Sequence, residues 1–451
     1  MRVTLPPMTD PAELARELAE AGVAGLTIVW ADNNGIPRSR TVPVAALEAT
    51  ATRGVGATPL LAVFDTHDAI TYAYEGLSTP SGDVRHVPVL ERVQQLAGQP
   101  SLAWAPSRVL DADGTPWSLD PRGALEAQVD AAAQAGLEVR AGFEIEFFAG
   151  LDDDSAVPAH HGPAYSPHAL LQIDELVADL LRDLESNGLR IGQLHAEYGL
   201  AQVELSLAAT DPLSAADDQL LARQTIHAAA RANGLRASFA PLITAAGVGQ
   251  GWHLHTSVAR DGRNLLAGGP TGDGASWIAG LLRELPAIAS ITTPSVPSQI
   301  RLRPGYFAGA YAFWGVENRE AALRYIPGGA LLGDDAANVE LKACDASAKP
   351  YLALAAVIAA GLAGISDGLP LADPINEDPG GWSDEQREAA GVLPLPTDLA
   401  AQEEALTAPS PVAGALGPER IGAFLAARRS DAAWAADREL DEIVAAHLWR
   451  Y

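Results

Sequence analysis

Apolar and polar residues follow two different periods along this chain. The spacing of apolar positions over residues 10–21 predicts a short amphipathic helix, and further helices are expected at 122–135 and 211–233. Apolar runs at 25–30 and 142–148 predict strands, and the first is followed by the turn sequence Asp32-Asn33-Asn34-Gly35. An alanine-rich apolar run at 351–365 is too short to span a bilayer, so it predicts a buried helix.

The length of the chain bounds its domain organisation. At 451 residues it exceeds one ordinary core, which suggests two domains. The sequence Asp111-Ala112-Asp113-Gly114-Thr115-Pro116 predicts a break, so we expect a small α+β unit at 1–110 and a catalytic domain at 111–451. The stretch 370–411 is rich in proline, glycine and acidic residues and predicts a long surface connection.

Two carboxylates interrupt an apolar strand in Phe143-Glu144-Ile145-Glu146-Phe147. Residues two apart on a strand share a face, so Glu144 and Glu146 would enter the same space. An isolated glutamate pair is usually a solvated face, but a buried, unpartnered carboxylate is costly. Further side chains able to bind metal or charge occur at the same spacing or between these segments: His253 with His255, Glu340 with Lys342, and Glu197 and Glu204.

Convergence of these groups would require cations. Two bare carboxylates ~4 Å apart repel by roughly 4 kcal/mol at an effective dielectric of 20. Oxygen-rich sites with one imidazole suit Mg²⁺ or Mn²⁺, whereas structural zinc sites favour thiolates and several histidines. The chain has one cysteine, Cys344, which we expect to be a small buried thiol in a reducing cytoplasm.

Six ordered motifs resemble the glutamine synthetase superfamily over nearly the whole chain. They are Gly142-Phe143-Glu144-Ile145-Glu146-Phe147, the segment Glu197 to Glu204, Gly249-Gln250-Gly251-Trp252-His253-Leu254-His255, Arg301-Leu302-Arg303-Pro304-Gly305-Tyr306, Glu317-Asn318-Arg319-Glu320-Ala321-Ala322-Leu323-Arg324, and Glu340 to Leu352. The resemblance implies an α+β fold: a small amino-terminal β-grasp domain and a larger catalytic domain whose curved antiparallel sheet forms a funnel.

The same resemblance implies roles for individual residues. One divalent site would use Glu146, Glu197 and Glu204, and the second would use Glu144, His253 and Glu340. Gly249, Arg301 and Lys342 would bind glutamate, whereas His255, Ser257, Arg319 and Arg324 would bind ATP, with Arg319 also catalytic. These residue types suit phosphoryl transfer, which depends on positioning and charge neutralisation.

Departures from the family pattern concern the nucleophile. Ammonium-using members carry an acidic residue where this chain has Phe307, and an aspartate near the position of Thr58. Loss of both favours a nucleophile with its own carbon chain, and a ring face can contact a cationic amine at ~0.5 to 2 kcal/mol. Lys342 replaces a common arginine and loses its bidentate fork.

The chain is therefore most similar to the glutamine synthetase-like γ-glutamyl amine ligases, in particular the actinobacterial γ-glutamylpolyamine synthetases. This predicts ATP-dependent joining of the glutamate γ-carboxylate to a primary amine through γ-glutamyl phosphate. The expected amine is a polyamine such as putrescine, cadaverine, spermidine or spermine. The alternatives are a monoamine, such as ethanolamine or an arylamine, or a non-catalytic nucleotide-binding sensor. His195, two residues before Glu197, is a candidate for the base that removes the proton from the amine. The alternative is a structural role beside the metal ligands.

Charge adds a minor argument about partners. With 30 Lys plus Arg and 57 Asp plus Glu, the net charge of -27 repels nucleic acid and is compatible with cationic polyamines. The amino terminus lacks an apolar signal core, so no membrane partner is expected. The resemblance further implies a homo-dodecamer of two hexameric rings with active sites shared between neighbours.

Overall fold

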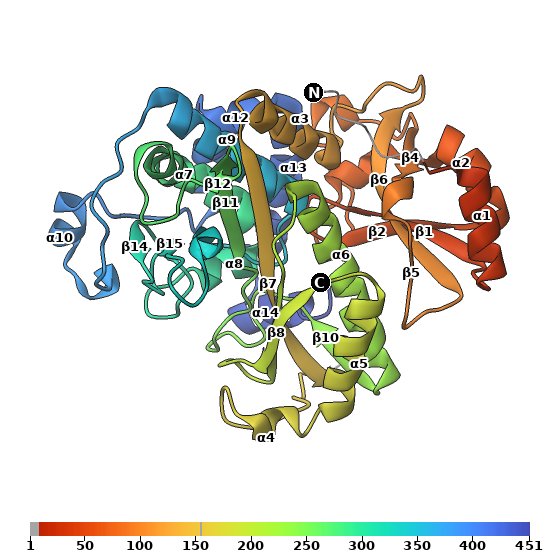
Figure 1. The fold of residues 1–451 in the computed structure, drawn as a ribbon, viewed down its shortest axis with the longest axis horizontal. Helices are drawn as coiled ribbons and strands as arrows, with labels where there is room; N and C mark the ends of the chain where they lie inside the picture. The colour runs from red at the N-terminus through yellow and green to blue at the C-terminus, as the bar shows by residue number, and fades with distance from the viewer. Residues whose placement is uncertain (1–8, 154–155) are drawn as a thin grey trace.

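The computed structural model describes residues 9–153 and 156–451 and shows a mixed helix and strand fold (Figure 1). The first predicted helix is α1 (Pro11–Glu20), which begins where the Asp10 side chain accepts the amide of Ala12 at 2.9 Å. It ends at Glu20, with Ala21 as its C-cap, before Gly22 in the left-handed region at φ 82°. Strand β1 (Gly25–Ala31) follows, as the apolar run predicted.

A six-stranded sheet occupies this part of the chain, in the order β2-β1-β6-β4-β3 with β5 paired to β6. Strands β1 and β6 run parallel and the other neighbours antiparallel. Its remaining elements are β2 (Pro37–Pro43), η1 (Val44–Ala46), α2 (Leu47–Arg53), β3 (Val55–Ala57), η2 (Pro59–Val63), η3 (Glu75–Leu77), β4 (Val84–Pro88), η4 (Leu90–Arg92), β5 (Gln94–Gln95) and β6 (Leu102–Asp111).

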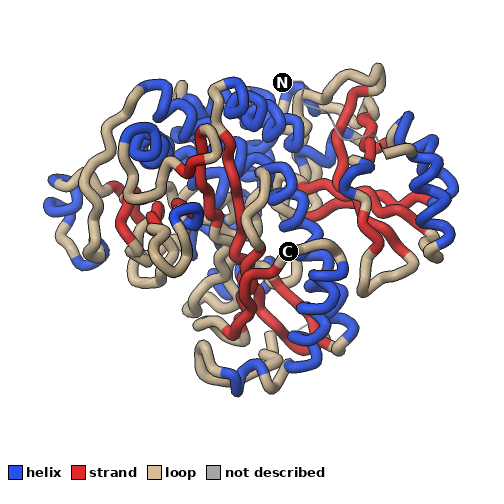
Figure 2. The backbone as a smooth tube through the Cα atoms, viewed as in Figure 1, coloured by secondary structure: helices blue, strands red, loops and turns tan. Residues whose placement is uncertain are grey.

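A nine-stranded sheet forms the framework of the rest of the chain, in the order β14-β15-β16-β11-β7-β9-β8, with β10 on β7 and β12 on β11. The long strand β7 (Glu138–Leu151) pairs with both β11 and β9 and so joins the two halves of this curled sheet (Figure 2). The predicted curved antiparallel sheet is confirmed, except that β14 and β15 pair in parallel. The other strands are β8 (Ile191–Ala196), β9 (Gln202–Leu207), β10 (Leu235–Ser238), β11 (Leu254–Arg260), β12 (Arg263–Asn264), β14 (Trp314–Val316), β15 (Leu323–Ile326) and β16 (Asn338–Leu341), and β13 (Tyr311–Ala312) pairs separately with β17 (Leu393–Pro394).

Helices cover this sheet, and their core is α9 (Pro350–Asp367) packed on α7 (Gly272–Thr292). A Cβ at Gly364 would lie 2.1 Å from the carbonyl oxygen of Ser276 and 2.7 Å from the Cα of Gly280, so the two helix backbones meet where each carries a glycine. By length and composition α9 could cross a membrane, but 72 % of it is buried inside the protein, as expected of a core helix. The others are α3 (Pro121–Gln134), α4 (Pro167–Leu170), α5 (Asp174–Ser186), α6 (Pro212–Ala232), α8 (Val296–Arg301), η5 (Asp334–Ala336), η6 (Pro379–Gly381), α10 (Asp384–Ala389), α11 (Leu399–Thr407), α12 (Pro411–Leu416), α13 (Pro418–Ala435) and α14 (Leu440–His447).

The prediction of a surface connection over 370–411 is wrong for its second half. Helix α11 lies there, and Gln402 and Leu406 on it are fully buried. The Gln402 amide donates to the Thr293 carbonyl at 3.0 Å. Asp398 caps this helix by accepting from the Ala401 amide. The prediction failed because only a few positions of this proline-rich, acidic segment face inward.

The predicted turn after β1 packs against α6 and the start of α9. Asn33 and Asn34 are buried, and the Lys349 ammonium donates to the Asn33 side chain at 2.8 Å. Arg223 donates to the Gly35 carbonyl at 2.9 Å. Gly35 has a φ of 68°, and a Cβ there would lie 2.6 Å from the Ala348 carbonyl oxygen. The turn therefore requires glycine for both its conformation and its close packing.

Candidate active site

A cavity of about 950 Å³ opens beside β7, β8, β9 and β16. The inward residues Phe143, Ile145 and Phe147 of β7 are buried in the core, which sends the alternating Glu144 and Glu146 to the cavity side. Of the residues predicted for the site, those lining this cavity are Glu144, Glu146, Glu197, Glu204, Gly249, His253, Arg301, Phe307, Arg319, Arg324, Glu340 and Lys342. Residues far apart in sequence therefore share one space.

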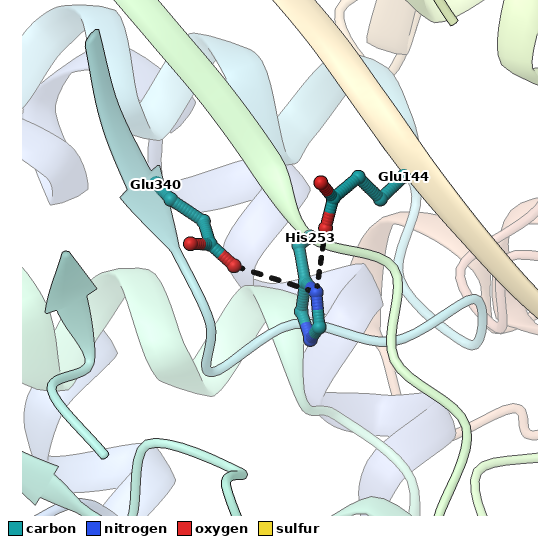
Figure 3. Close-up of side chains that lie close together, drawn as sticks. All are labelled: Glu144, His253 and Glu340. Atoms are coloured by element: carbon teal, nitrogen blue, oxygen red, sulfur yellow. Dashed lines mark hydrogen bonds and ion pairs between the residues drawn. The ribbon is translucent and has the colours of Figure 1, made fainter. Parts of the chain in front are cut away.

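The first candidate metal cluster comprises Glu144, His253 and Glu340 (Figure 3). The Nδ1 atom of His253 lies 3.2 Å from a Glu144 oxygen and 3.4 Å from a Glu340 oxygen. The amide of Glu144 donates to the carbonyl of His253 at 3.0 Å, so the strand ladder itself holds the two side chains together. These are the three residues that the family resemblance implies for one divalent ion, and the structure brings them together.

The second cluster comprises His195, Glu197 and Glu204. Its predicted third member, Glu146, lies opposite Glu204 in the β7–β9 pair but outside this cluster. Glu146 instead accepts from Gln202 and from the amide of Gly251, each at 2.6 Å, and its other oxygen lies 3.7 Å from His253. Glu146 therefore lies between the two clusters.

Charge in this cavity is unevenly compensated. Burial, with repulsion from Glu146, Glu144 and Glu197, raises the pKa of Glu204 to about 9. Burial also opposes ionisation of Glu144, but hydrogen bonds with His253 and His255 outweigh it and lower the pKa of that carboxyl. The carboxylate-rich, single-imidazole first cluster and the repulsion at Glu204 fit hard divalent cations such as Mg²⁺ or Mn²⁺.

Cationic side chains surround the carboxylates. Arg324, opposite Glu340 in the β15–β16 pair, lies 2.8 Å from one oxygen of Glu340, and Lys342 lies 3.2 Å from the other. Arg301 is buried, and its Nη1 has no hydrogen-bond partner among the described residues. A buried guanidinium nitrogen left unpaired at a cavity wall fits an anionic substrate group.

Three predicted site residues lie outside the cavity lining. His255 is behind Glu144, with its Nε2 3.3 Å from that carboxylate and its Nδ1 2.9 Å from Asn338. Ser257 is further along β11, opposite Arg140. Thr58 caps η2 in the six-stranded sheet region by accepting from Leu60 at 3.3 Å. Their nucleotide-binding and amine-binding roles stay predictions.

The structure adds residues to which the sequence assigned no role. Gln202 donates to Glu146, and its place two residues before Glu204 on a strand could have identified it. Tyr165 donates to Glu197 at 2.8 Å from the loop between β7 and α4, where no sequence pattern pointed to it. Tyr198 and Leu332 also line the cavity.

Comparison with known proteins defines the class. Residues 118–442 match the family model of the glutamine synthetase catalytic domain. The crystal structure of a novel glutamine synthase homolog superposes with a TM-score of 0.84 at 30 % identity, covering 95 % of this chain and 99 % of that one. The chain belongs to the glutamine synthetase family.

Individual relatives differ in their activities. The gamma-glutamylpolyamine synthetase GlnA3 of Streptomyces coelicolor is 41 % identical over 447 residues, which is 97 % of this chain and 96 % of the relative. The glutamine synthetase of Pyrococcus horikoshii is 30 % identical over 399 residues, covering 86 % of this chain and 85 % of the relative. The family and the site together indicate an ATP-dependent ligase that joins glutamate to an amine.

Proposed function

We propose that this protein is a γ-glutamylpolyamine synthetase that couples ATP hydrolysis to amide formation between glutamate and a polyamine. The observation that carries the proposal is the pair of carboxylate and imidazole clusters in one cavity, beside the unpartnered Nη1 of Arg301. Its similarity to the Streptomyces enzyme supports the polyamine over ammonium.

The protein's part in the first step is to position two anions. Glu144, His253 and Glu340 would hold one divalent ion, and Glu197 and Glu204, with His195 or Glu146, the other. Such ions neutralise phosphate charge. Arg301 binds the α-carboxylate of glutamate, while Arg319 and Arg324 contact ATP phosphates. The γ-carboxylate oxygen attacks the γ-phosphorus, the bond to ADP breaks, and γ-glutamyl phosphate forms.

In the second step the amine nitrogen attacks the acyl carbon and phosphate leaves. An alkylammonium has a pKa near 10.4, as lysine does, so a proton must be removed before attack. Where Glu146 completes the second metal site, His195 is free of metal and is our candidate acceptor; it lies at the cavity, 3.8 Å from Glu204. Phe307, Tyr165 and Tyr198 line the same cavity and offer ring faces to a cationic chain.

The test is phosphate release that depends on both ATP and glutamate, measured with ammonium, putrescine, cadaverine, spermidine, spermine, ethanolamine and aniline. We expect polyamines to give the highest kcat/KM. Turnover with ammonium that equals or exceeds it would overturn the polyamine assignment, and preference for ethanolamine or aniline would support the monoamine alternative. Binding of ATP and metal without stimulation by any amine would support a sensor.

We also propose that the protein forms a homo-dodecamer of two hexameric rings. We place it in the cytoplasm and its domain boundary near residue 111. The six-stranded sheet ends at Asp111, which supports that boundary. Cys344 is buried and free, which is compatible with a reducing compartment. Among the described residues, none before Glu144 lines the cavity, so the chain's own amino-terminal region contributes nothing to its walls, as expected if a neighbouring subunit supplies that part. Light scattering of the purified protein tests the subunit number.

A further inference from the structure

One strained residue lies at the mouth of the cavity. Phe307 lines the cavity yet is 56 % exposed, and its φ of 54° lies in the left-handed region. A phenylalanine is a poor residue for that conformation, which glycine adopts without strain. Its persistence therefore requires the surrounding structure to hold it.

The base of this loop is anchored on both sides. On the amino-terminal side, Arg303 donates to the Gly247 carbonyl at 2.7 Å and its guanidinium lies 3.9 Å from the Tyr306 ring centroid. On the carboxy-terminal side Ala308 is buried, and a Cβ at Gly309 would lie 3.0 Å from the Cα of Ala322. These anchors fix the ends of the loop but do not contact the Phe307 peptide.

The contact to Phe307 itself comes from Glu320. The amide of Phe307 donates to a Glu320 carboxylate oxygen at 3.2 Å, and the Gly305 amide interacts with the same carboxylate. Burial together with Asp378 raises the pKa of Glu320, while the amides of Phe307 and Gly305 favour its charged form. One side chain thus binds the two residues of the loop that have positive φ at its exposed tip.

The turn that carries Glu320 is itself rigid. Asn318 donates to the carbonyls of Ile375 and Glu377 at 2.9 Å each, and its side-chain oxygen accepts the Glu320 amide at 3.0 Å. Arg319, which lines the cavity, lies between these two residues. A single fixed turn therefore presents one residue to the cavity and the next to the Phe307 loop.

We infer that Glu320 is a positioning residue that holds the Phe307 ring at the cavity mouth and so sets which amine is accepted. This inference rests on the proposed ligase function. Removing Glu320 would free Phe307 to relax toward negative φ, which would move its ring away from the path of the amine. Glutamate and ATP, bound by other residues, would be little affected.

The first experiment compares Glu320→Ala, Glu320→Gln and Glu317→Gln. Glu317 is an exposed carboxylate on the same turn, so its variant is the matched control. For Glu320→Ala we expect KM for spermidine to rise about fivefold, which is the effect of losing the hydrogen bond that positions the Phe307 amide. KM for glutamate and KM for ATP should stay within about twofold of the wild type. Glutamine keeps an acceptor oxygen and should rescue most of the change. An unchanged KM for spermidine, or an equal rise in all three constants, would overturn the inference.

A double-mutant cycle tests whether Glu320 acts through Phe307. Glycine at 307 adopts a positive φ without strain and has no ring to position. In a Phe307→Gly background, Glu320→Ala should therefore change KM for spermidine by less than about twofold. An undiminished effect would show that Glu320 acts independently and would contradict the inference.

Hydrogen exchange supplies a readout that does not need activity. In Glu320→Ala, amide exchange in a peptide covering residues 303–310 should accelerate, whereas Glu317→Gln should match the wild type. If the wild type is active and amide exchange in Glu320→Ala is unchanged, the inference about Glu320 is wrong but the proposed function stands. A wild type that turns over no amine overturns the proposed function, and the role in amine choice with it.

Discussion

The imidazole of His253 lies 3.2 Å from Glu144, 109 residues earlier in the chain, and a backbone hydrogen bond between the same two residues fixes the pair. The ring is buried, and Glu340 approaches the same Nδ1 atom. Two carboxylates that converge on one nitrogen leave several oxygen lone pairs directed at a common point. That geometry suits a shared cation better than a permanent pair of ionised acids.

Removing one of these carboxylates should abolish tight metal binding. Changes beside a metal ligand already cost about 10- to 100-fold in affinity, so Glu144→Gln should weaken Mn²⁺ binding by about 100-fold or more. Paramagnetic resonance titration of Mn²⁺ measures the change. Glu138→Gln, at the exposed start of the same strand, is the control and should bind as the wild type does. Equal affinities for the two variants would contradict the assignment.

The raised pKa of Glu204, about 9 against an ordinary 4.5, predicts a pH effect on stability in chelator. Between pH 4.5 and 9 the Glu204 carboxyl keeps its proton in the folded state but releases it in the unfolded state. The free energy of unfolding is therefore highest below pH 4.5 and falls as the pH rises toward 9. Mg²⁺ should displace the proton and remove the decline. Urea unfolding from pH 5 to 9, with chelator or with Mg²⁺, measures it.

In Glu204→Gln the loss of stability between pH 5 and 9 should disappear, because the glutamine amide does not titrate. A second test is calorimetry of Mg²⁺ binding in two buffers of different ionisation enthalpy, which should show proton release by the wild type and less by the variant. The same decline in the variant would assign it to another group.

Arg301 should determine the affinity for glutamate. Its buried, unpartnered Nη1 would bind an acidic substrate group, and a hydrogen bond to a charged group contributes about 1.5 to 3 kcal/mol. Arg301→Lys should therefore raise KM for glutamate by about 10- to 100-fold and leave KM for ATP nearly unchanged. Steady-state kinetics measure both constants. The exposed Arg182→Lys is the control, and parallel changes in both KM values would argue against a direct contact.

The buried turn between β1 and β2 should control stability. Gly35→Ala adds a Cβ 2.6 Å from the Ala348 carbonyl oxygen at a positive φ, so it should cost more than about 3 kcal/mol of unfolding free energy. Gly22→Ala is a matched control, because Gly22 has a φ of 82° but open space around it, and should cost about 1 kcal/mol. Urea unfolding measures both, and equal losses would show that packing at Gly35 contributes nothing.

Local sequence determined the elements and the chemistry of the site. The spacing of apolar residues predicted α1, because an amphipathic helix buries one face, and continuous apolar runs predicted β1 and the buried α9. Glutamates between phenylalanines on β7 predicted a cation site, because burial without a counter-charge is too costly. Ordered motifs predicted the family, which the family model confirms.

Tertiary structure alone decided how these residues meet. The position of Glu146 between two clusters, the place of His255 behind Glu144, and the contribution of Tyr165 depend on strand register and on loops that bring distant segments together. The same holds for Glu320, whose bond to the Phe307 amide crosses 13 residues of chain. Sequence patterns report which side of its own element a residue faces, whereas the partner across a cavity is set by how separate elements pack.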